Sequence, residues 1–199
     1  MLCALLSPTS GETRVLGESL ARSSYKARAK IGYMSQKFSL YSDISVKENL
    51  LFFAGVYGLS GKHKEEKVQS MLTIFELEKY ALIASKELPL GFKQRLSLAC
   101  AVMHDPVALF LDEPTSGVDP ITRREFWNHI YALAQKGMSV MVTTHFMDEA
   151  EYCDKIALIY KGRAIALDSP HNLTQEVGEN ATMEDAFVEL IKRSENGSF

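Results

Sequence analysis

The sequence predicts an α/β fold in which parallel strands alternate with helices, and two observations support this prediction. A short apolar run over 107–111 ends in two adjacent carboxylates, Asp112 and Glu113, as expected where a buried strand stops. A second apolar run over 139–144 ends at His145, and a stretch with helical spacing separates the two runs. This order is typical of a strand–helix–strand unit in a parallel sheet.

The composition indicates one globular domain, or one domain with a small insertion. The 199 residues are 46% hydrophobic and 24% charged, which suits a sizeable core. The net charge is −3 and the pI is near 6.0, so no overall basic charge points to nucleic acid or anionic lipid. The cysteines, Cys3, Cys100 and Cys153, are odd in number and scattered, which argues against a disulfide framework or a cysteine metal site.

The sequence shows no membrane-spanning segment. No apolar run reaches the ~18 residues that cross a bilayer. The N-terminus lacks the basic region that opens a signal peptide. We therefore expect a reducing cytosolic compartment and membrane association only through a partner.

The first elements are a turn-rich segment over 7–11 and a candidate strand over 13–16. A second strand is expected over 31–35, ending at Gln36. A lone Gln after a strand carries no function by itself.

Two helices are expected next. Ser45 and Glu48 have capping-box spacing and predict a helix that runs to about Tyr57. The charged run over 62–67 opens a second helix toward Leu77, and such a run is most often a solvated face.

The second half contains further helices and a hairpin. A helix that follows 87–95 is broken by Pro106. Pro120 suits the first position of a helix that Gly137 ends. Beyond His145 we expect a short helix over 147–152, a hairpin of 156–160 with 163–167, an amphipathic helix from Thr182 and a frayed tail over 194–199.

The chemistry of the Asp112–Glu113 pair suits Mg²⁺ and a water molecule. Mg²⁺ keeps most of its waters and takes one or two carboxylates plus substrate phosphates, often at the carboxyl end of a strand. Asp112 is then expected to hold the Mg²⁺ shell, and Glu113 to act as general base toward the attacking water. The alternative is a surface Asp-Glu pair that opens a turn.

LFLDEPTSGVDP and VMVTTHFMDEAEYCDKIALIYKGRAIALDSP resemble the Walker B, D-loop and switch-histidine segments of ABC-type ATPases, the nucleotide-binding domains of ABC transporters. The resemblance implies that Asp112 is the Walker B aspartate, Glu113 the catalytic glutamate and His145 the switch histidine. IGYMSQ resembles the Q-loop, in which Gln36 contacts Mg²⁺ and the water. The D-loop residues are Ser116, Gly117, Val118 and Asp119.

LPLGF resembles the signature motif, which usually reads LSGGQ. Its residues are Leu88, Pro89, Leu90, Gly91 and Phe92. Pro89 has neither hydroxyl nor N–H, Leu90 replaces the first glycine, and Gly91 is retained. The longer segment LPLGFKQRLSLA resembles a branch of exporter-type ATP-binding proteins that includes multidrug exporters.

The resemblance implies a P-loop NTPase (RecA-like) core formed by 1–37 and 106–199, with an inserted α-helical subdomain over 38–105 that carries the signature motif. The first strand and the phosphate-binding loop GxxxxGK[ST] of this fold are missing from the sequence. We therefore expect an N-terminally truncated domain that binds ATP weakly or not at all by itself.

The resemblance also implies a function: an ATP-binding and ATP-hydrolysing subunit of an ABC exporter, with ATP and Mg²⁺ as cofactors. The expected partners are a second ABC ATP-binding domain and an integral membrane permease, which holds the chain on the cytoplasmic face of the membrane. No nucleic acid partner is expected, because the heptads and basic stripes of chromosome-maintenance ATPases are absent. Two alternatives stay open, a non-hydrolysing degenerate subunit and a soluble ribosome-associated ATPase.

Overall fold

The computed structural model describes residues 1–3 and 5–195. The chain forms two compact units, Met1–Thr143 and Thr144–Phe199. The predicted division into a core of 1–37 and 106–199 and a helical subdomain of 38–105 stays a prediction.

A three-stranded parallel sheet forms the centre of the first unit. Its strands are β3 (Ile31–Met34), β4 (Ala108–Asp112) and β5 (Ser139–Thr143), in the order β3-β4-β5. Met34 pairs with Leu111, and Asp112 pairs with Thr143. The carboxyl ends of the three strands therefore meet at one edge of the sheet, and the predicted α/β fold with parallel strands is confirmed.

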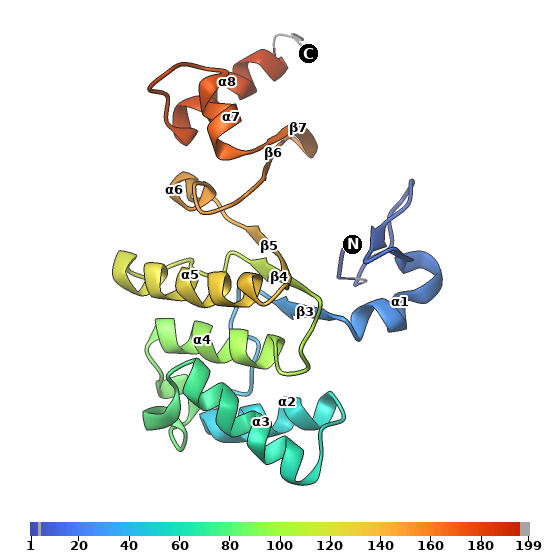
Figure 1. Cartoon of the computed structure of the whole chain (residues 1–199), viewed down its shortest axis with the longest axis vertical. Helices are drawn as coiled ribbons and strands as arrows, with labels where there is room; N and C mark the ends of the chain where they lie inside the picture. Colours follow the sequence, from blue (N-terminus) through green and yellow to red (C-terminus); the bar gives the residue numbers. More distant parts are fainter. Residues whose placement is uncertain (4, 196–199) are drawn as a thin grey trace. The chain divides into compact units, whose positions relative to one another are not determined.

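Four long helices connect these strands. Helices α2 (Val46–Val56), α3 (Gly61–Ile74) and α4 (Leu90–Ala101) lie between β3 and β4, and α5 (Pro120–Gln135) lies between β4 and β5. Figure 1 shows α4 between α5 and the α2–α3 pair. Short 3-10 helices, η1 (Glu78–Tyr80) and η2 (Ser85–Glu87), precede α4.

The helix ends follow the signals in the sequence. The Ser45 hydroxyl accepts from the Glu48 N–H, and a Glu48 carboxylate oxygen accepts from the Ser45 N–H at 2.8 Å, which confirms the capping box. Pro120 occupies the first turn of α5, as predicted. The core of this unit is apolar and closed to solvent, with fully buried side chains that include Leu96, Leu98, Met103, Leu109, Leu111 and Phe126.

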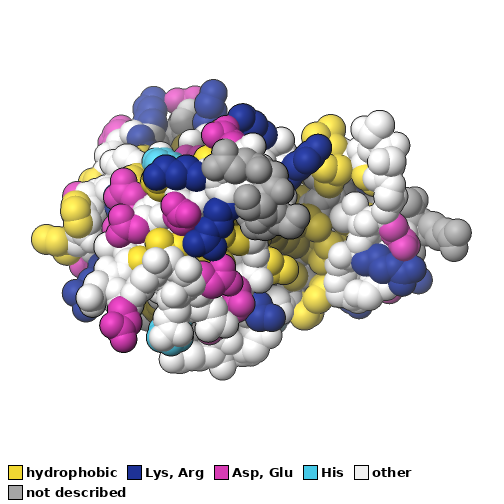
Figure 2. All heavy atoms as spheres, turned by 90° about the horizontal axis from the view of Figure 1, so that it is seen from above, with side chains coloured by type: hydrophobic (Ala, Val, Ile, Leu, Met, Phe, Trp, Pro, Cys, Tyr) yellow, Lys and Arg dark blue, Asp and Glu magenta, His cyan; other side chains and the backbone are white. Residues whose placement is uncertain are grey.

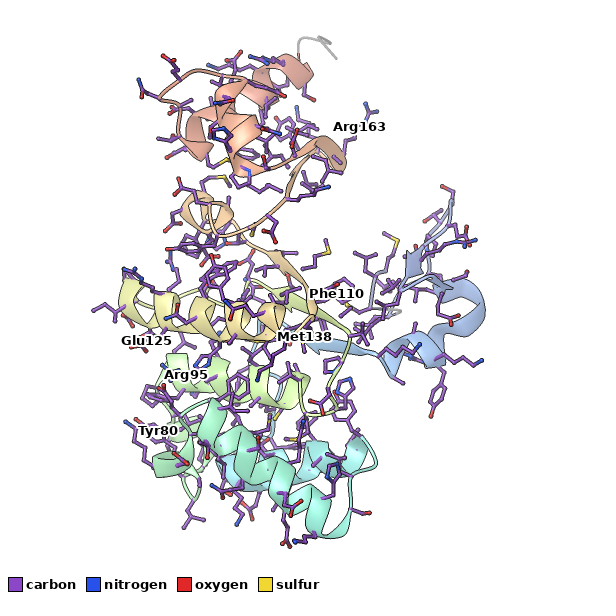
Figure 3. The ribbon with its side chains drawn as sticks, viewed as in Figure 1. Tyr80, Arg95, Phe110, Glu125, Met138 and Arg163 are labelled. Carbon is purple, nitrogen blue, oxygen red and sulfur yellow. The ribbon has the colours of Figure 1, made fainter. Side chains whose placement is uncertain are left out.

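Arg95 links three elements of the first unit. Its side chain is 4% exposed, and its Nη1 donates to Glu76 beyond the end of α3 at 2.5 Å. Its Nη2 donates to Glu125 on α5 at 2.6 Å. Figure 3 labels Arg95 on α4 and Glu125 on the neighbouring helix α5. A buried guanidinium with two carboxylate partners therefore joins α4 to α5 and to the α3 end.

The N-terminal part of the first unit is a small hairpin followed by a helix. Strands β1 (Arg14–Val15) and β2 (Glu18–Ser19) pair antiparallel, and α1 (Leu20–Arg28) follows. The sequence reasoning predicted a strand near β1 but missed α1. Val15, Leu20, Ala27 and Ile31 form an apolar cluster against Phe110 of β4.

The described residues of the second unit, 144–195, form a hairpin and three helices. Its elements are α6 (Met147–Ala150), β6 (Ile156–Tyr160), β7 (Arg163–Asp168), α7 (Pro170–Gln175) and α8 (Met183–Glu195). The predicted hairpin is confirmed, while α7 was missed despite its Ser169 cap and Pro170 at the first position. The predicted frayed tail is helical at 194–195, and residues 196–199 lie outside the described part.

Among the described residues of the first unit, 1–3 and 5–143, β5 pairs with β4. None of the helices in these described ranges is both long and apolar enough to cross a bilayer. On the face that Figure 2 shows, Lys, Arg, Asp and Glu side chains are interspersed.

Candidate nucleotide site

The carboxyl ends of β3 and β4 bring two predicted site residues into contact. Gln36 follows β3, and its Nε2 donates to Oε2 of Glu113 at 2.7 Å. The two residues are far apart in the sequence, so the sheet register creates this pair. Parallel α/β sheets bind ligands at this edge.

Asp112 is the last residue of β4 and is half-buried. Its Oδ1 accepts a hydrogen bond from Oγ1 of Thr143 at 2.6 Å. Within the described residues, no side chain or backbone group donates to Oδ2 of Asp112. One carboxylate oxygen is therefore oriented by the neighbouring strand, and the other is available to a ligand.

Glu113 lies in an unusual backbone conformation. Its φ is +43°, in the left-handed region that non-glycine residues rarely adopt. Its N–H donates to the Thr143 carbonyl oxygen at 3.0 Å and to Thr143 Oγ1 at 3.2 Å. Its own carbonyl oxygen accepts from the Ser116 N–H at 3.2 Å. These bonds hold the turn that presents the carboxylate.

Thr143 is the site residue that sequence reasoning missed. It ends β5 and is the register partner of Asp112. No local pattern marks this residue, because its place beside Asp112 depends on the pairing of β4 with β5. The sequence reasoning assigned a role to His145 at the end of this run and none to Thr143.

The predicted D-loop forms the turn between β4 and α5. Gly117 has a φ of +76°, which favours glycine. The Asp119 carboxylate accepts from the Ile121 and Thr122 N–H groups, both at 3.1 Å, and so caps α5. Hydrogen bonds from Thr122, then from the Ile121 amide, hold the pKa of Asp119 below its usual range. Asp119 therefore has a structural role as the N-cap of α5.

The predicted signature residues form the start of α4. Leu88 is buried, Pro89 occupies the N-cap position, and Leu90 is 43% exposed. The Phe92 ring lies 4.4 Å from the Tyr80 ring between centroids. A Cβ added to Gly91 would lie 2.2 Å from Cγ2 of Thr122 on α5. Gly91 is thus required for the close approach of α4 and α5.

His145 belongs to the second unit. Its side chain is exposed, and its ring centroid lies 4.1 Å from that of Phe146. The structure therefore brings together Gln36, Asp112 and Glu113, while the catalytic role of His145 stays a prediction.

The donor set at this edge fits Mg²⁺. No cluster of three or more His, Cys, Asp or Glu side chains suited to a metal occurs in the described ranges 1–3 and 5–195. Asp112 and Glu113 supply carboxylates and Gln36 supplies an amide, all with oxygen ligands. Mg²⁺ needs only a few protein ligands, because water molecules and substrate phosphates complete its octahedral coordination.

Comparison with known proteins identifies related chains. A family model described as ABC transporter matches residues 1–116. The probable multidrug ABC transporter ATP-binding protein YbhF of Escherichia coli K12 is 57% identical over 195 residues, covering 96% of this chain and 34% of YbhF. The chain thus spans about a third of that relative.

Two further comparisons cover more of the other protein. Nod factor export ATP-binding protein I of Burkholderia lata is 36% identical over 206 residues, covering 98% of this chain and 68% of that protein. A solved structure described as the ATP binding subunit of an ABC transporter superposes with a TM-score of 0.82 at 26% identity, over 96% of this chain and 80% of that one. The P-loop NTPase fold of ABC ATPases is therefore confirmed, and the chain belongs to the ATP-binding proteins of the ABC transporter family.

Proposed function

We propose that this chain is the ATP-binding and ATP-hydrolysing part of an ABC exporter. The observation that carries the proposal is the Gln36–Glu113 hydrogen bond of 2.7 Å beside Asp112, at the carboxyl edge of a parallel sheet. A carboxylate and an amide in contact at this edge suit the positioning of a water molecule for phosphoryl transfer. A relative named for Nod factor export supports the direction of transport, and a relative named as a multidrug ABC transporter ATP-binding protein supports the transport role.

In this proposal the three residues at the edge divide two tasks, activation of the water molecule and binding of Mg²⁺. Glu113 accepts the proton of the attacking water at its carboxylate, and Gln36 orients that carboxylate through its Nε2. Asp112 and Gln36 hold the Mg²⁺ shell. Bound Mg²⁺ would neutralise charge on the phosphates of ATP.

The remaining predicted residues act in a larger assembly. We assign His145 to a contact with the γ-phosphate. The predicted D-loop (116–119) and the predicted signature residues (88–92) are assigned to contacts with a second ATP-binding domain. The N-terminus of α4 suits an oxyanion, although Pro89 removes one donor. A membrane permease would receive the motion and hold the chain at the cytoplasmic face.

We further propose that the chain binds ATP weakly by itself. The pattern GxxxxGK[ST], whose backbone amides and lysine cradle the β- and γ-phosphates, does not occur in the 199 residues. Binding then depends on the Mg²⁺ ligands and the few contacts of the β3–β4 edge.

Hydrolysis by a form extended at its N-terminus with a strand, a GxxxxGKST loop and a helix tests the proposal. We expect turnover of MgATP by this form, and a loss of about 10²- to 10⁴-fold in Glu113→Gln with nucleotide binding retained. Glu151→Gln removes an exposed carboxylate from the second unit and serves as the control. Turnover unchanged in Glu113→Gln would contradict the role of Glu113.

A further inference from the structure

The hydroxyl of Thr143 touches both carboxylate residues of the candidate site. Thr143 Oγ1 donates to Asp112 Oδ1 at 2.6 Å, and it accepts from the Glu113 N–H at 3.2 Å. A threonine hydroxyl has one proton to donate and two lone pairs, so the two bonds are compatible. Thr143 is therefore a bridge between the side chain of one site residue and the backbone of the next.

The bridge supports a conformation that Glu113 does not favour alone. A non-glycine residue at a φ of +43° is strained, and such strain persists only where neighbouring bonds hold the backbone. Two bonds from the same N–H to Thr143, one to its carbonyl oxygen and one to its hydroxyl, supply this restraint. Thr143 therefore holds the backbone of Glu113, and Gln36 contacts the carboxylate of the same residue.

Thr143 also suits this task better than its neighbours do. It is the register partner of Asp112, and its branched Cβ restricts χ1 and so fixes the hydroxyl direction. The next residue, Thr144, uses its hydroxyl differently, because its Oγ1 accepts from the Phe146 N–H at 3.0 Å. The Thr143 hydroxyl, by contrast, donates to the Asp112 carboxylate at the end of β4.

We infer that Thr143 is a positioning residue, whose hydroxyl sets the direction of the Asp112 carboxylate toward a divalent cation and holds the Glu113 turn in place. Its relevance to turnover rests on the proposed function of the site. The two hydrogen bonds themselves are a property of this chain and are measurable without nucleotide.

Three variants of the 199-residue chain separate the hydroxyl from the side-chain shape. Thr143→Val keeps the branched shape and removes the hydroxyl, and Thr143→Ser keeps the hydroxyl. Ser139→Ala removes a hydroxyl from the same face of β5 at its other end and is the control. If Thr143→Val does not fold, Thr143→Ala replaces it in the same measurements.

The first readout is hydrogen exchange of the Glu113 amide by NMR. We expect exchange about tenfold faster in Thr143→Val than in the wild type, and wild-type exchange in Thr143→Ser and Ser139→Ala. Rescue by serine distinguishes the hydroxyl bridge from a packing effect. Wild-type exchange in a folded Thr143→Val or Thr143→Ala variant would overturn the inference.

The second readout is broadening of the Asp112 resonances by MnCl₂ as a paramagnetic substitute for Mg²⁺. We expect weaker broadening at a given Mn²⁺ concentration in Thr143→Val than in the wild type or Thr143→Ser. Equal broadening in all forms would overturn the part of the inference that concerns the cation. An absence of broadening in every form, with the exchange result as expected, would contradict the proposed Mg²⁺ role of Asp112 while supporting the Thr143 bridge.

Discussion

Glu113 is held from two sides, by Gln36 at its carboxylate and by Thr143 at its amide. Glu113 directly follows the largely buried strand β4, so the sheet holds the backbone from which its side chain extends. Gln36 is exposed and comes from the loop after β3, so it is the more adjustable member of the pair. If Glu113 is the proposed general base, this hydrogen bond suits the placement of a water molecule before its deprotonation.

Replacement of Gln36 tests this bond. In the N-terminally extended form, Gln36→Ala is expected to lower MgATP turnover about ten- to hundred-fold, because a hydrogen bond to a charged group is lost. Single-turnover kinetics, with nucleotide binding measured separately, checks this result. Lys37→Ala alters the next exposed side chain and should leave turnover unchanged. A Gln36→Ala variant that turns over at the wild-type rate would contradict the positioning role.

Part of this site was predictable from residue types alone. Asp112 and Glu113 follow an apolar run, so their place at a strand end could be read from the sequence. The functional role of Gln36 was predicted only from the resemblance to the Q-loop. Its contact with Glu113 depends on a sheet register that no local pattern specifies. Thr143 was missed for the same reason, because its importance comes from the strand it pairs with.

At the scale of elements, the contact between α4 and α5 depends on Gly91. An added Cβ would meet Thr122 Cγ2 at 2.2 Å, well inside van der Waals contact. The Leu90 side chain also lies close to Gly117, since a Cβ there would be 3.3 Å from Leu90 Cδ2. The predicted signature segment and the predicted D-loop with the start of α5 are therefore packed together within this chain.

Gly91→Ala is expected to destabilise the chain by about 1–3 kcal/mol through overpacking. Thr122→Ser removes the clashing methyl group, so the double variant should recover most of the lost stability. Gly55→Ala in α2 is the control, because its added Cβ meets only the flexible Lys64 Nζ at 3.3 Å. Chemical denaturation of the four variants measures these differences, and equal stability of Gly91→Ala and wild type would contradict the packing.

The Arg95 cluster makes the same region sensitive to pH. The hydrogen bond from Arg95, followed by the charge of its guanidinium, lowers the pKa of Glu76 from its usual 4.5. A lowered pKa in the folded state contributes stability above about pH 4.5, and the contribution is lost as the pH falls through the lowered value. The Glu76 side chain is 69% exposed, so solvent screening keeps the effect modest.

We therefore expect the wild type to melt at a higher temperature than Glu76→Gln at pH 6–7, with the difference shrinking below about pH 4. Thermal melts over this pH range measure the difference. Glu87→Gln, another exposed glutamate near the start of α4, is the control and should follow the wild type. A difference between wild type and Glu76→Gln that is independent of pH would show that the ion pair is not its source.

Most elements with a clear end signal were predicted. The capping box at Ser45 and the Pro120 helix start are local, so they specify their helices without tertiary information. Helix α1 was missed, and in the structure its Ser19 N-cap makes no side-chain cap bond. Helix α7 spans only Pro170–Gln175, and such a short helix carries too little periodicity to be read from the sequence.

At the scale of the whole molecule, the candidate nucleotide site consists of residues at the β3–β4 edge. The β3–β4 edge gathers an amide and two carboxylates, which suit Mg²⁺ and a water molecule. The 199 residues contain no GxxxxGK[ST] pattern. The chain spans about a third of YbhF, so the transport activity and partners of the longer protein are proposals.

Calorimetric titration of MgATP tests this account most directly. We expect clear binding by the form extended with a strand, GxxxxGKST loop and helix, and at least a hundredfold weaker binding by the 199-residue chain, because the phosphate cradle supplies most of the contacts. Asp112→Asn in the extended form should weaken binding of MgATP more than that of ATP without metal. Equally tight MgATP binding by the 199-residue chain would contradict the account, because phosphate binding would then come from residues other than those assigned here.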